Sequence, residues 1–179
     1  QFAIAYGDLK GSGSEEFDTS VPGKSPSSTN YGQYRSLVLG DENAEFVFGG
    51  ETVENFYAIS VDRNRYKEKL FPGSMTMTLE GPNGDIISLT DNSKVVTSVS
   101  FKDAGRVFEL VSGSTGVVNT SLNATGYSNS GSYGWLLPDI GTILLNPSAL
   151  DADPTDGGIE LGTLRNDNTN DHNPGRLYD

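Results

Sequence analysis

The chain of 179 residues contains no cysteine, one histidine and one tryptophan. The absence of cysteine excludes disulfides, thiol catalysis and zinc–thiolate sites. No apolar run reaches the length of about 18 residues that a membrane-spanning helix needs, so membrane insertion is not expected. The only histidine, His172, lies among turn-forming residues near the end of the chain, where we expect it to face solvent rather than to serve a catalytic triad.

Basic side chains are scarce. Twelve Lys and Arg residues stand against 24 Asp and Glu residues, which gives a formal net charge of -12. Because nucleic-acid binding depends on Lys and Arg displacing counterions from phosphates, nucleic acid is not an expected partner. The string PGKS at 22–25 is similar to part of a phosphate-binding loop, but Asp18 occupies the position where that loop needs its first glycine. No cofactor is therefore expected, and no pair of residues is marked out as catalytic, so we expect a protein that is not an enzyme.

Long amphipathic helices are also absent from the sequence. Short apolar runs separated by glycine, serine and asparagine are typical of β-strands joined by turns. We expect a mainly β fold of antiparallel strands with long loops, one short helix near residues 63–70 and an extended N-terminal arm. The apolar runs predict strands at 2–6, 34–40, 45–50, 55–61, 74–81, 85–91, 95–101, 106–113 and 141–147, with 74–81 and 85–91 forming a hairpin.

Changes in amino-acid composition along the sequence divide the chain into three parts. Residues 1–33 are rich in Gly, Ser, Pro and Thr and predict an arm or long loop. Residues 34–151 hold most of the apolar runs and predict a β-rich core, and residues 152–179 form a polar tail. We expect the chain to be a piece of a longer polypeptide.

One short segment concentrates positive charge. The string DRNRYKEKLFPG at 62–73 holds Arg63, Arg65, Lys67 and Lys69. Asp62 can cap a short helix over 63–70, which FPG would end. Three interpretations remain open: the basic side chains meet an acidic surface on a neighbouring subunit, they form a solvated helix face neutralised by Asp62 and Glu68, or they bind an acidic ligand or a glycan.

A cluster of acids follows the last predicted strand. Asp151, Asp153 and Asp156 in DADPTDGG could offer oxygen ligands to a cation such as calcium. The spacing does not match a helix-loop-helix calcium site, which needs glycine at the sixth position of its loop and glutamate at the twelfth. An acidic surface turn is the alternative interpretation.

The tryptophan lies in an aromatic and glycine-rich segment at 125–151. Trp135, with Tyr133 and Tyr127, could form a platform for sugars, which would make the chain a carbohydrate-binding or host-receptor-recognition module. Large aromatic side chains more often fill a core or an interface, and Trp135 is therefore also a candidate interface residue.

Four long strings carry a resemblance to a known class of protein. They are YGQYRSLVLG, FYAISVDRNRYKEKLFPGSMTMTLEG, DAGRVFELVSGS and GSYGWLLPDIGTILLNPSALD. In this order they resemble segments of large virion structural proteins from contractile-tailed, T-even-like bacteriophages of cyanobacteria. The resemblance spans roughly residues 2–165.

This resemblance implies a non-enzymatic structural subunit of the tail or baseplate, assembled in the host cytoplasm and present in the virion as a symmetric set of copies. The implied partners are copies of the chain itself and other virion structural proteins. A host glycan is a partner only under the carbohydrate-binding alternative. No catalytic residues are implied.

Overall fold

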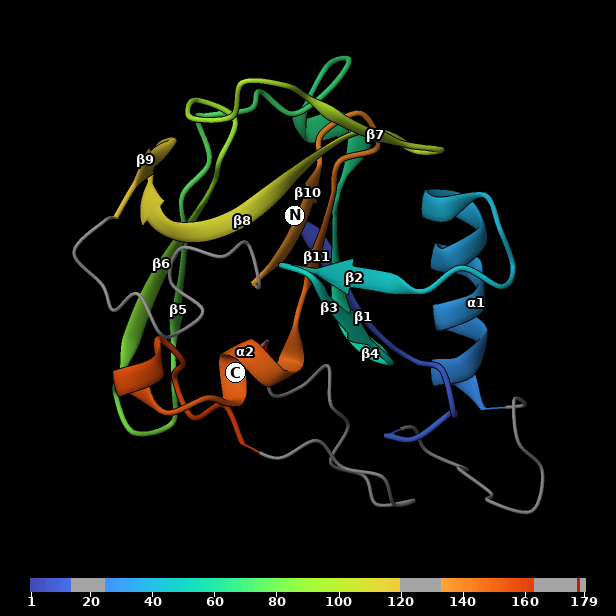
Figure 1. The fold of residues 1–179 in the computed structure, drawn as a ribbon, viewed down its shortest axis with the longest axis horizontal. Helices are drawn as coiled ribbons and strands as arrows, with labels where there is room; N and C mark the ends of the chain where they lie inside the picture. Colours follow the sequence, from blue (N-terminus) through green and yellow to red (C-terminus); the bar gives the residue numbers. More distant parts are fainter. Residues whose placement is uncertain (14–24, 120–132, 163–176, 178–179) are drawn as a thin grey trace.

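The fold is mainly β, as the sequence predicts, and all of its strand pairs are antiparallel (Figure 1). The structure is a computed structural model that describes residues 1–13, 25–119, 133–162 and 177. Its strands are β1 (Phe2–Asp8), β2 (Phe46–Phe48), β3 (Glu51–Val53), β4 (Asn55–Val61), β5 (Met77–Glu80), β6 (Ile86–Asp91), β7 (Ser100–Lys102), β8 (Gly105–Ser114), β9 (Val117–Val118), β10 (Gly134–Leu137) and β11 (Thr142–Leu145). Its helices are α1 (Pro26–Leu39) and α2 (Pro147–Asp151), with short 3-10 turns η1 (Arg63–Arg65) and η3 (Pro154–Asp156).

One curled sheet organises the described residues. Its strands follow the order β1-β4-β11-β10-β8-β6-β5, and β7 and β9 also pair with β8. The long strand β8 joins β1, β4, β11 and β10 on one side of the sheet to β6 and β5 on the other. Its middle pairs with β10, and its C-terminal half pairs with β6. A separate two-stranded hairpin, β2-β3, lies beside this sheet.

The central strands β4, β10 and β11 are buried on both faces of the sheet. Successive side chains of a strand point to opposite faces, so each of these strands contributes to two apolar clusters. Phe56, Trp135 and Leu144 pack in one cluster with residues of α1 and the β2-β3 hairpin. Tyr57 and Leu145 belong to the other, which includes residues of β6, β8 and α2. Burial on both faces explains why these strands read as continuous apolar runs rather than as alternating ones.

Helix α1 lies where the sequence predicts a loop followed by a strand. The strand predicted at 34–40 is wrong, and so is the loop predicted for 26–33, because both lie in or at the end of α1. Ser25 caps its N-terminus with a side chain that accepts from the backbone N–H of Ser28, and Gly40 ends it in the left-handed conformation at φ 68°. Tyr31 and Val38 point from one side of α1 into the core, a helical spacing that the sequence already contained.

The predicted division into arm, core and tail does not match the packed unit. Residues of β1 pair with β4 along its whole length, so the predicted arm is part of the sheet there. At the other end, Ile159 is 1% exposed and its backbone N–H donates to the carbonyl oxygen of Leu150. The core therefore extends beyond the boundaries at 33 and 151. Residues 14–24 of the arm and 163–176 of the tail lie outside the described residues.

The other strand predictions are largely confirmed. β1, β2, β4, β6, β8 and β11 lie where the apolar runs predict them, and β5 and β6 form the predicted hairpin. Several predicted strands are shorter than expected, above all those at 74–81 and 95–101, where β5 begins at Met77 and β7 at Ser100. Strands β3, β9 and β10 were not predicted. Neither α1 nor α2, the α-helices of the described residues, is long and apolar enough to cross a membrane.

Truncation of Leu144 should show how strongly the fold depends on its central strands. Leu144 is fully buried in β11, in the same cluster as Phe56, Trp135 and Tyr31 of α1. We expect Leu144→Ala to lower the free energy of unfolding by about 2–5 kcal/mol, because the cavity cannot fully collapse. Val117→Ala is the control, since Val117 is 66% exposed and its truncation should change stability little. Urea unfolding of both variants measures the difference, and equal effects would contradict this account of the core.

Candidate functional site

The basic segment forms an exposed loop rather than a helix. We call residues 62–71 the basic loop. Asp62 caps it as predicted, because its carboxylate accepts from the backbone N–H of Asn64 at 2.9 Å. The predicted helix over 63–70 is wrong, since only Arg63–Arg65 form a 3-10 turn and Tyr66 is already extended at φ -137° and ψ 147°.

Tertiary contacts explain why the helix does not continue. The ring of Tyr66 lies so close to Gly141, in the β10-β11 turn, that a Cβ at Gly141 would overlap the phenol. Further along, the backbone N–H of Leu70 donates to the carbonyl oxygen of Pro138 at 3.0 Å. These contacts hold the basic loop in an extended path over the turn, at the cost of its own helical hydrogen bonds.

A buried carboxylate anchors the far end of the basic loop. The backbone N–H of Gly73 lies 2.9 Å from both carboxylate oxygens of Asp91, which is fully buried. Asp91 also accepts from the backbone N–H of Ser93 at 3.2 Å. Gly73 has φ 80° and lies against Lys94, where a Cβ would collide with that side chain. The end of the basic loop and the turn at 91–94 are thereby fixed to each other.

The four basic side chains predicted as a site share this loop but do not share one role. Arg63 is used locally, because it donates to the carbonyl oxygen of Glu68 at 2.8 Å and its guanidinium lies 4.9 Å from the centre of the Tyr66 ring. Arg65, Lys67 and Lys69 are exposed, and none of their side chains forms a hydrogen bond or ion pair with another described residue. Their charge is therefore available at the surface.

The turn beneath the basic loop is held by an ion pair. Arg106 of β8 and Asp139 of the β10-β11 turn lie 2.6 Å apart. The hydrogen bond from Arg106 lowers the pKa of the Asp139 carboxyl, and Lys69 lowers it slightly further by its positive charge. Lys69 thus contributes to the field over this turn, and the loop that carries it rests on a fixed support.

Apolar side chains are exposed beside the charges. Phe71, at the end of the basic loop, is 76% exposed. The neighbouring segment 94–101 was predicted as a strand from residue 95, but its residues are exposed and only its end belongs to β7. Its large apolar side chains are exposed by 60% at Val95, 37% at Val96, 43% at Val99 and 68% at Phe101. Large apolar groups gathered at one surface mark contact sites more often than isolated ones do.

Trp135 fills the core, which is one of the roles expected for a large aromatic side chain, and its predictions as part of a sugar platform and as an interface residue are wrong. It is 4% exposed, and the rings of Phe46 and Phe48 meet it edge-on at 5.9 and 5.1 Å between centroids. Tyr133 is also buried, and Tyr127 lies outside the described residues. Two of the three rings of the predicted sugar platform are therefore inside the fold.

A half-buried acid accompanies the tryptophan. The indole N–H of Trp135 donates to Oε1 of Glu109 at 3.2 Å, while Oε2 of Glu109 is buried without a partner among the described residues. Burial raises the pKa of Glu109 to about 7, although the indole and Lys102 oppose that rise. Sequence reasoning missed Glu109, and the signal was a single acid inside the apolar run of β8.

The predicted aspartate cluster does not form a metal site. Asp153 uses its carboxylate to cap η3, accepting from the backbone N–H and the hydroxyl of Thr155 at 2.7 and 2.6 Å. Asp151 accepts from the backbone N–H of Gly162 at 2.8 Å. Across the part of the chain that the structure describes, no three His, Cys, Asp or Glu residues are placed to share a metal ion, and Asp156 completes no such group.

Comparison with known proteins gives no relative. A scan against protein-family models, a search of curated proteins and a search of solved structures each return no match.

Removal of the Asp91 carboxylate should loosen the basic loop. Asp91→Ala leaves the buried N–H of Gly73 without its acceptor, at a cost of about 1–3 kcal/mol. Because the loop carries several trypsin sites, we expect trypsin to cut after Arg65 or Lys67 roughly tenfold faster than in the unmodified chain. Limited proteolysis with peptide mapping measures this, and Asp156→Ala, which removes an exposed acid, is the control. Equal cleavage rates in all three proteins would show that Asp91 does not anchor the loop.

Replacement of Glu109 should change how stability depends on pH. The folded chain holds the Glu109 proton up to a pKa of about 7, against an ordinary value of 4.5, so its ionisation destabilises the fold as pH rises between these values. Glu109 is partly solvated, and we expect the unmodified chain to lose about 1–2 kcal/mol relative to Glu109→Gln between about pH 5 and about pH 8. Urea unfolding at both pH values measures this difference.

The only tryptophan supplies a second readout of the same group. Trp135 emission should titrate with a midpoint near pH 7 in the unmodified chain and not in Glu109→Gln. A stability difference that stays constant with pH, together with an identical emission profile in both proteins, would contradict the assignment.

Proposed function

We propose that the chain is a structural subunit of a tailed-bacteriophage virion, in the tail or baseplate, and that it acts through contacts between subunits. Its partners are copies of itself and other virion structural proteins. The observation that carries the proposal is the surface formed by the basic loop and Phe71, where charge and a large aromatic side chain are exposed together. The resemblance of four ordered strings to virion structural proteins supports the same function.

The way the surface is held also supports an assembly role. Asp91, Gly141 and Pro138 fix the basic loop to the sheet through buried or backbone contacts. A loop held in one conformation loses little conformational entropy when a partner binds, and this favours a defined contact over an adaptable one. Among the interpretations of the basic segment, neutralisation by Asp62 and Glu68 finds no support at Arg63, which contacts a carbonyl oxygen and a ring rather than a carboxylate, whereas the exposed charges of Arg65 and Lys67 favour a partner.

A carbohydrate-binding module is not favoured by the described residues. Its platform would need exposed aromatic faces, but Trp135 and Tyr133 are 4% and 0% exposed. The structural role is therefore the function that these residues support best.

Electron microscopy of the native material that contains this chain, combined with mass analysis, tests the proposal. We expect the chain at a fixed copy number in a symmetric tail-like or baseplate-like particle, because a structural subunit repeats with the symmetry of its assembly. Recovery of the chain only as a free monomer or small oligomer from phage-producing cells would overturn the proposal.

A further inference from the structure

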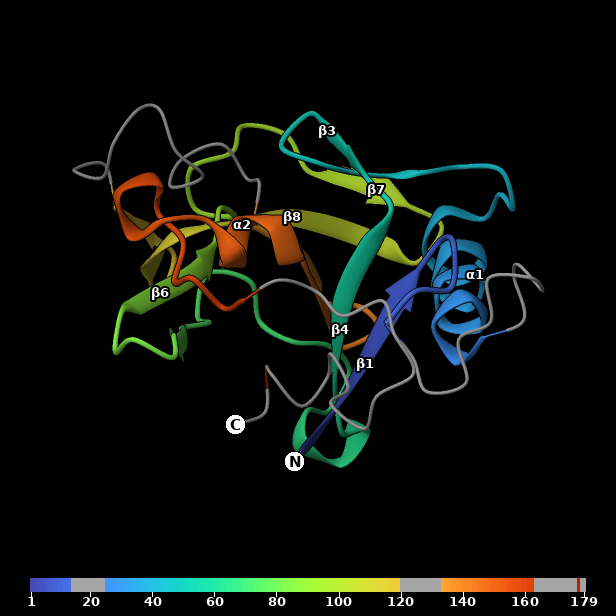
Figure 2. The ribbon, with the colours of Figure 1, turned by 90° about the horizontal axis from the view of Figure 1, so that it is seen from below.

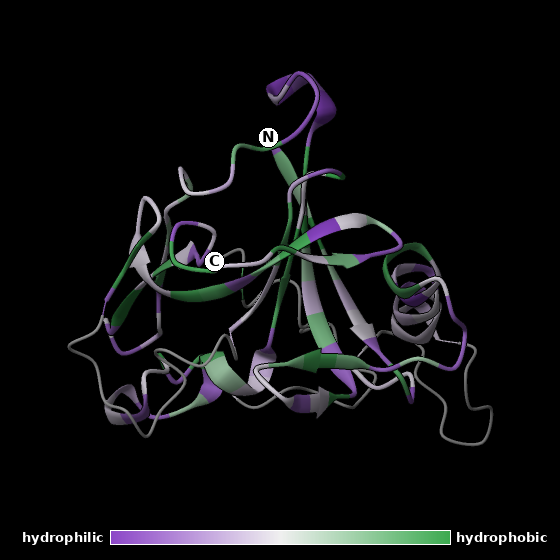
Figure 3. Ribbon diagram, turned by 45° about the horizontal axis from the view of Figure 1, so that its top comes forward, coloured by the Kyte–Doolittle hydropathy of each residue, from purple (hydrophilic) through white to green (hydrophobic). Residues whose placement is uncertain are grey.

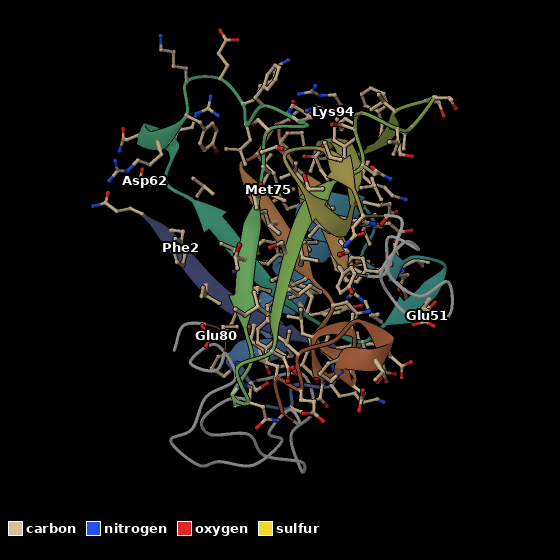
Figure 4. The ribbon with its side chains drawn as sticks, turned by 90° about the vertical axis from the view of Figure 1, so that its left-hand side faces the viewer. Phe2, Glu51, Asp62, Met75, Glu80 and Lys94 are labelled. Atoms are coloured by element: carbon tan, nitrogen blue, oxygen red, sulfur yellow. The ribbon has the colours of Figure 1, made fainter. Side chains whose placement is uncertain are left out.

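The basic loop and the segment 94–101 lie at the same end of the molecule, which we call the basic end (Figure 4). In Figure 4 the labelled Asp62 and Lys94 lie at the same upper end of the molecule. Gly73, two residues after the basic loop, approaches Ser93 and Lys94 at the start of the segment 94–101. Half of the large apolar side chains that are exposed within the described residues belong to this end.

The opposite end of the molecule carries acids. We call it the acidic end, and it comprises the turn between β5 and β6 together with α2, η3 and the residues that follow. Figure 1 shows these elements at the lower left, away from η1 and β7 at the top. Its exposed acids are Glu80, Asp151, Asp153, Asp156 and Glu160, and Ile86 beside them is 65% exposed.

Specific contacts hold the turns of the acidic end together. Gly81 lies against the backbone of Ile159 so closely that a Cβ at Gly81 would collide with it. Nδ2 of Asn83 donates to the carboxylate of Glu160 at 2.7 Å, which ties the hairpin turn to the residues after η3. The exposed acids therefore keep fixed positions relative to Ile86.

We propose that the basic end of one copy docks on the acidic end of a second copy, so that the chains associate head to tail. The inference rests on the proposed structural function and specifies the partner surface. Each end offers both kinds of contact that the other needs: Arg65 and Lys67 face acids, and Phe71 and the valines of 94–101 face Ile86. Both ends occur on one chain whose net charge is -12, so the few exposed cations make the basic end the place where a second copy is least repelled.

Head-to-tail contact has a geometric consequence. The two surfaces in contact are different, so every added copy leaves one basic end and one acidic end open. Such an interface builds a ring if the rotation per copy closes, and an open filament if it does not. A closed pair related by a two-fold axis would instead use the same patch on both copies and leave no end open for a further copy.

Charge reversal at each end and at both ends together tests the proposal in the full chain. The basic-end variant is Arg65→Glu with Lys67→Glu, which avoids Arg63 because of its local contacts. The acidic-end variant is Glu80→Lys with Asp156→Lys, whose carboxylates make no hydrogen bond to another described residue. The combined variant carries all four changes and keeps the original net charge. The matched control is Glu42→Lys with Glu51→Lys, which changes net charge as the acidic-end variant does but at exposed positions outside both ends.

Sedimentation at increasing protein concentration measures the association, and circular dichroism checks that each variant is folded. We expect each single-end variant to associate roughly tenfold more weakly or worse, and the combined variant to recover, because its charges are exchanged between the ends. The control should associate at least as well as the unmodified chain. Absence of self-association in the unmodified chain, or equal association in all the variants, would overturn the proposal.

Cysteine pairing supplies an independent readout, since the chain contains no cysteine. Lys67→Cys and Asp156→Cys are prepared separately, mixed and oxidised. Head-to-tail docking predicts that the mixed disulfide forms faster than either disulfide between identical variants. Preferential pairing of Lys67→Cys with itself would overturn the proposal in favour of a two-fold contact.

The two experiments separate this inference from the proposed function. A symmetric native particle whose assembly tolerates both single-end variants would leave the structural function in place and overturn head-to-tail docking. A chain that forms the mixed disulfide and depends on both ends, but is absent from any phage particle, would support the docking and overturn the virion assignment.

Discussion

The fold depends on the burial of three central strands on both of their faces. β4, β10 and β11 present apolar side chains alternately to two clusters, and each cluster needs its own cover. Helix α1 and the β2-β3 hairpin cover one face, and the curl of the sheet with α2 closes the other (Figure 2). Figure 3 shows the consequence: hydrophobic residues follow the middle of the sheet, and hydrophilic ones gather at η1 and along the outer edges. Since the core occupies both faces of these strands, their own side chains are not available to a ligand.

This constraint decides the role of the aromatic residues. Trp135 alternates with Leu136 along β10, so it must point into one cluster or the other, and it points toward Phe46 and Phe48. Its polar N–H still needs an acceptor, and Glu109 on the paired strand supplies one at the cost of partial burial of a carboxyl group. The raised pKa of Glu109 is thus a product of the way the core accommodates an indole. A structural origin of this kind explains a perturbed acid without a catalytic role.

Sequence patterns predicted the strands better than the segments between them. The runs of β4 and β11 are apolar enough to be recognised without knowledge of their neighbours, because burial on both faces leaves no alternation to interpret. Helix α1 was missed because its first turn is made of Ser, Thr and Asn, residues that favour turns unless a cap and a packed face select the helix. The basic loop was wrongly predicted as a helix because the contacts that extend it come from Pro138 and Gly141, which lie about seventy positions later. For the candidate site, the charges could be found from sequence, but Asp91 and the exposed valines could not, since both depend on tertiary packing.

The contacts that anchor the basic loop explain why its basic residues do not form a solvated helix. A solvated helix would satisfy its own backbone and place its cations among nearby acids, where such pairs contribute about 0–1 kcal/mol each. Here the backbone of the loop is satisfied by the sheet instead, through Leu70 and Gly73. Arg63 then takes over the local contacts with Glu68 and Tyr66, and Phe71 is left exposed. A large ring exposed to water is unfavourable for an isolated chain. Its burial against another surface is favourable and would stabilise a complex. The same packing that fixes the loop therefore favours a partner that brings both negative charge and apolar area, and the acidic end of a second copy has both.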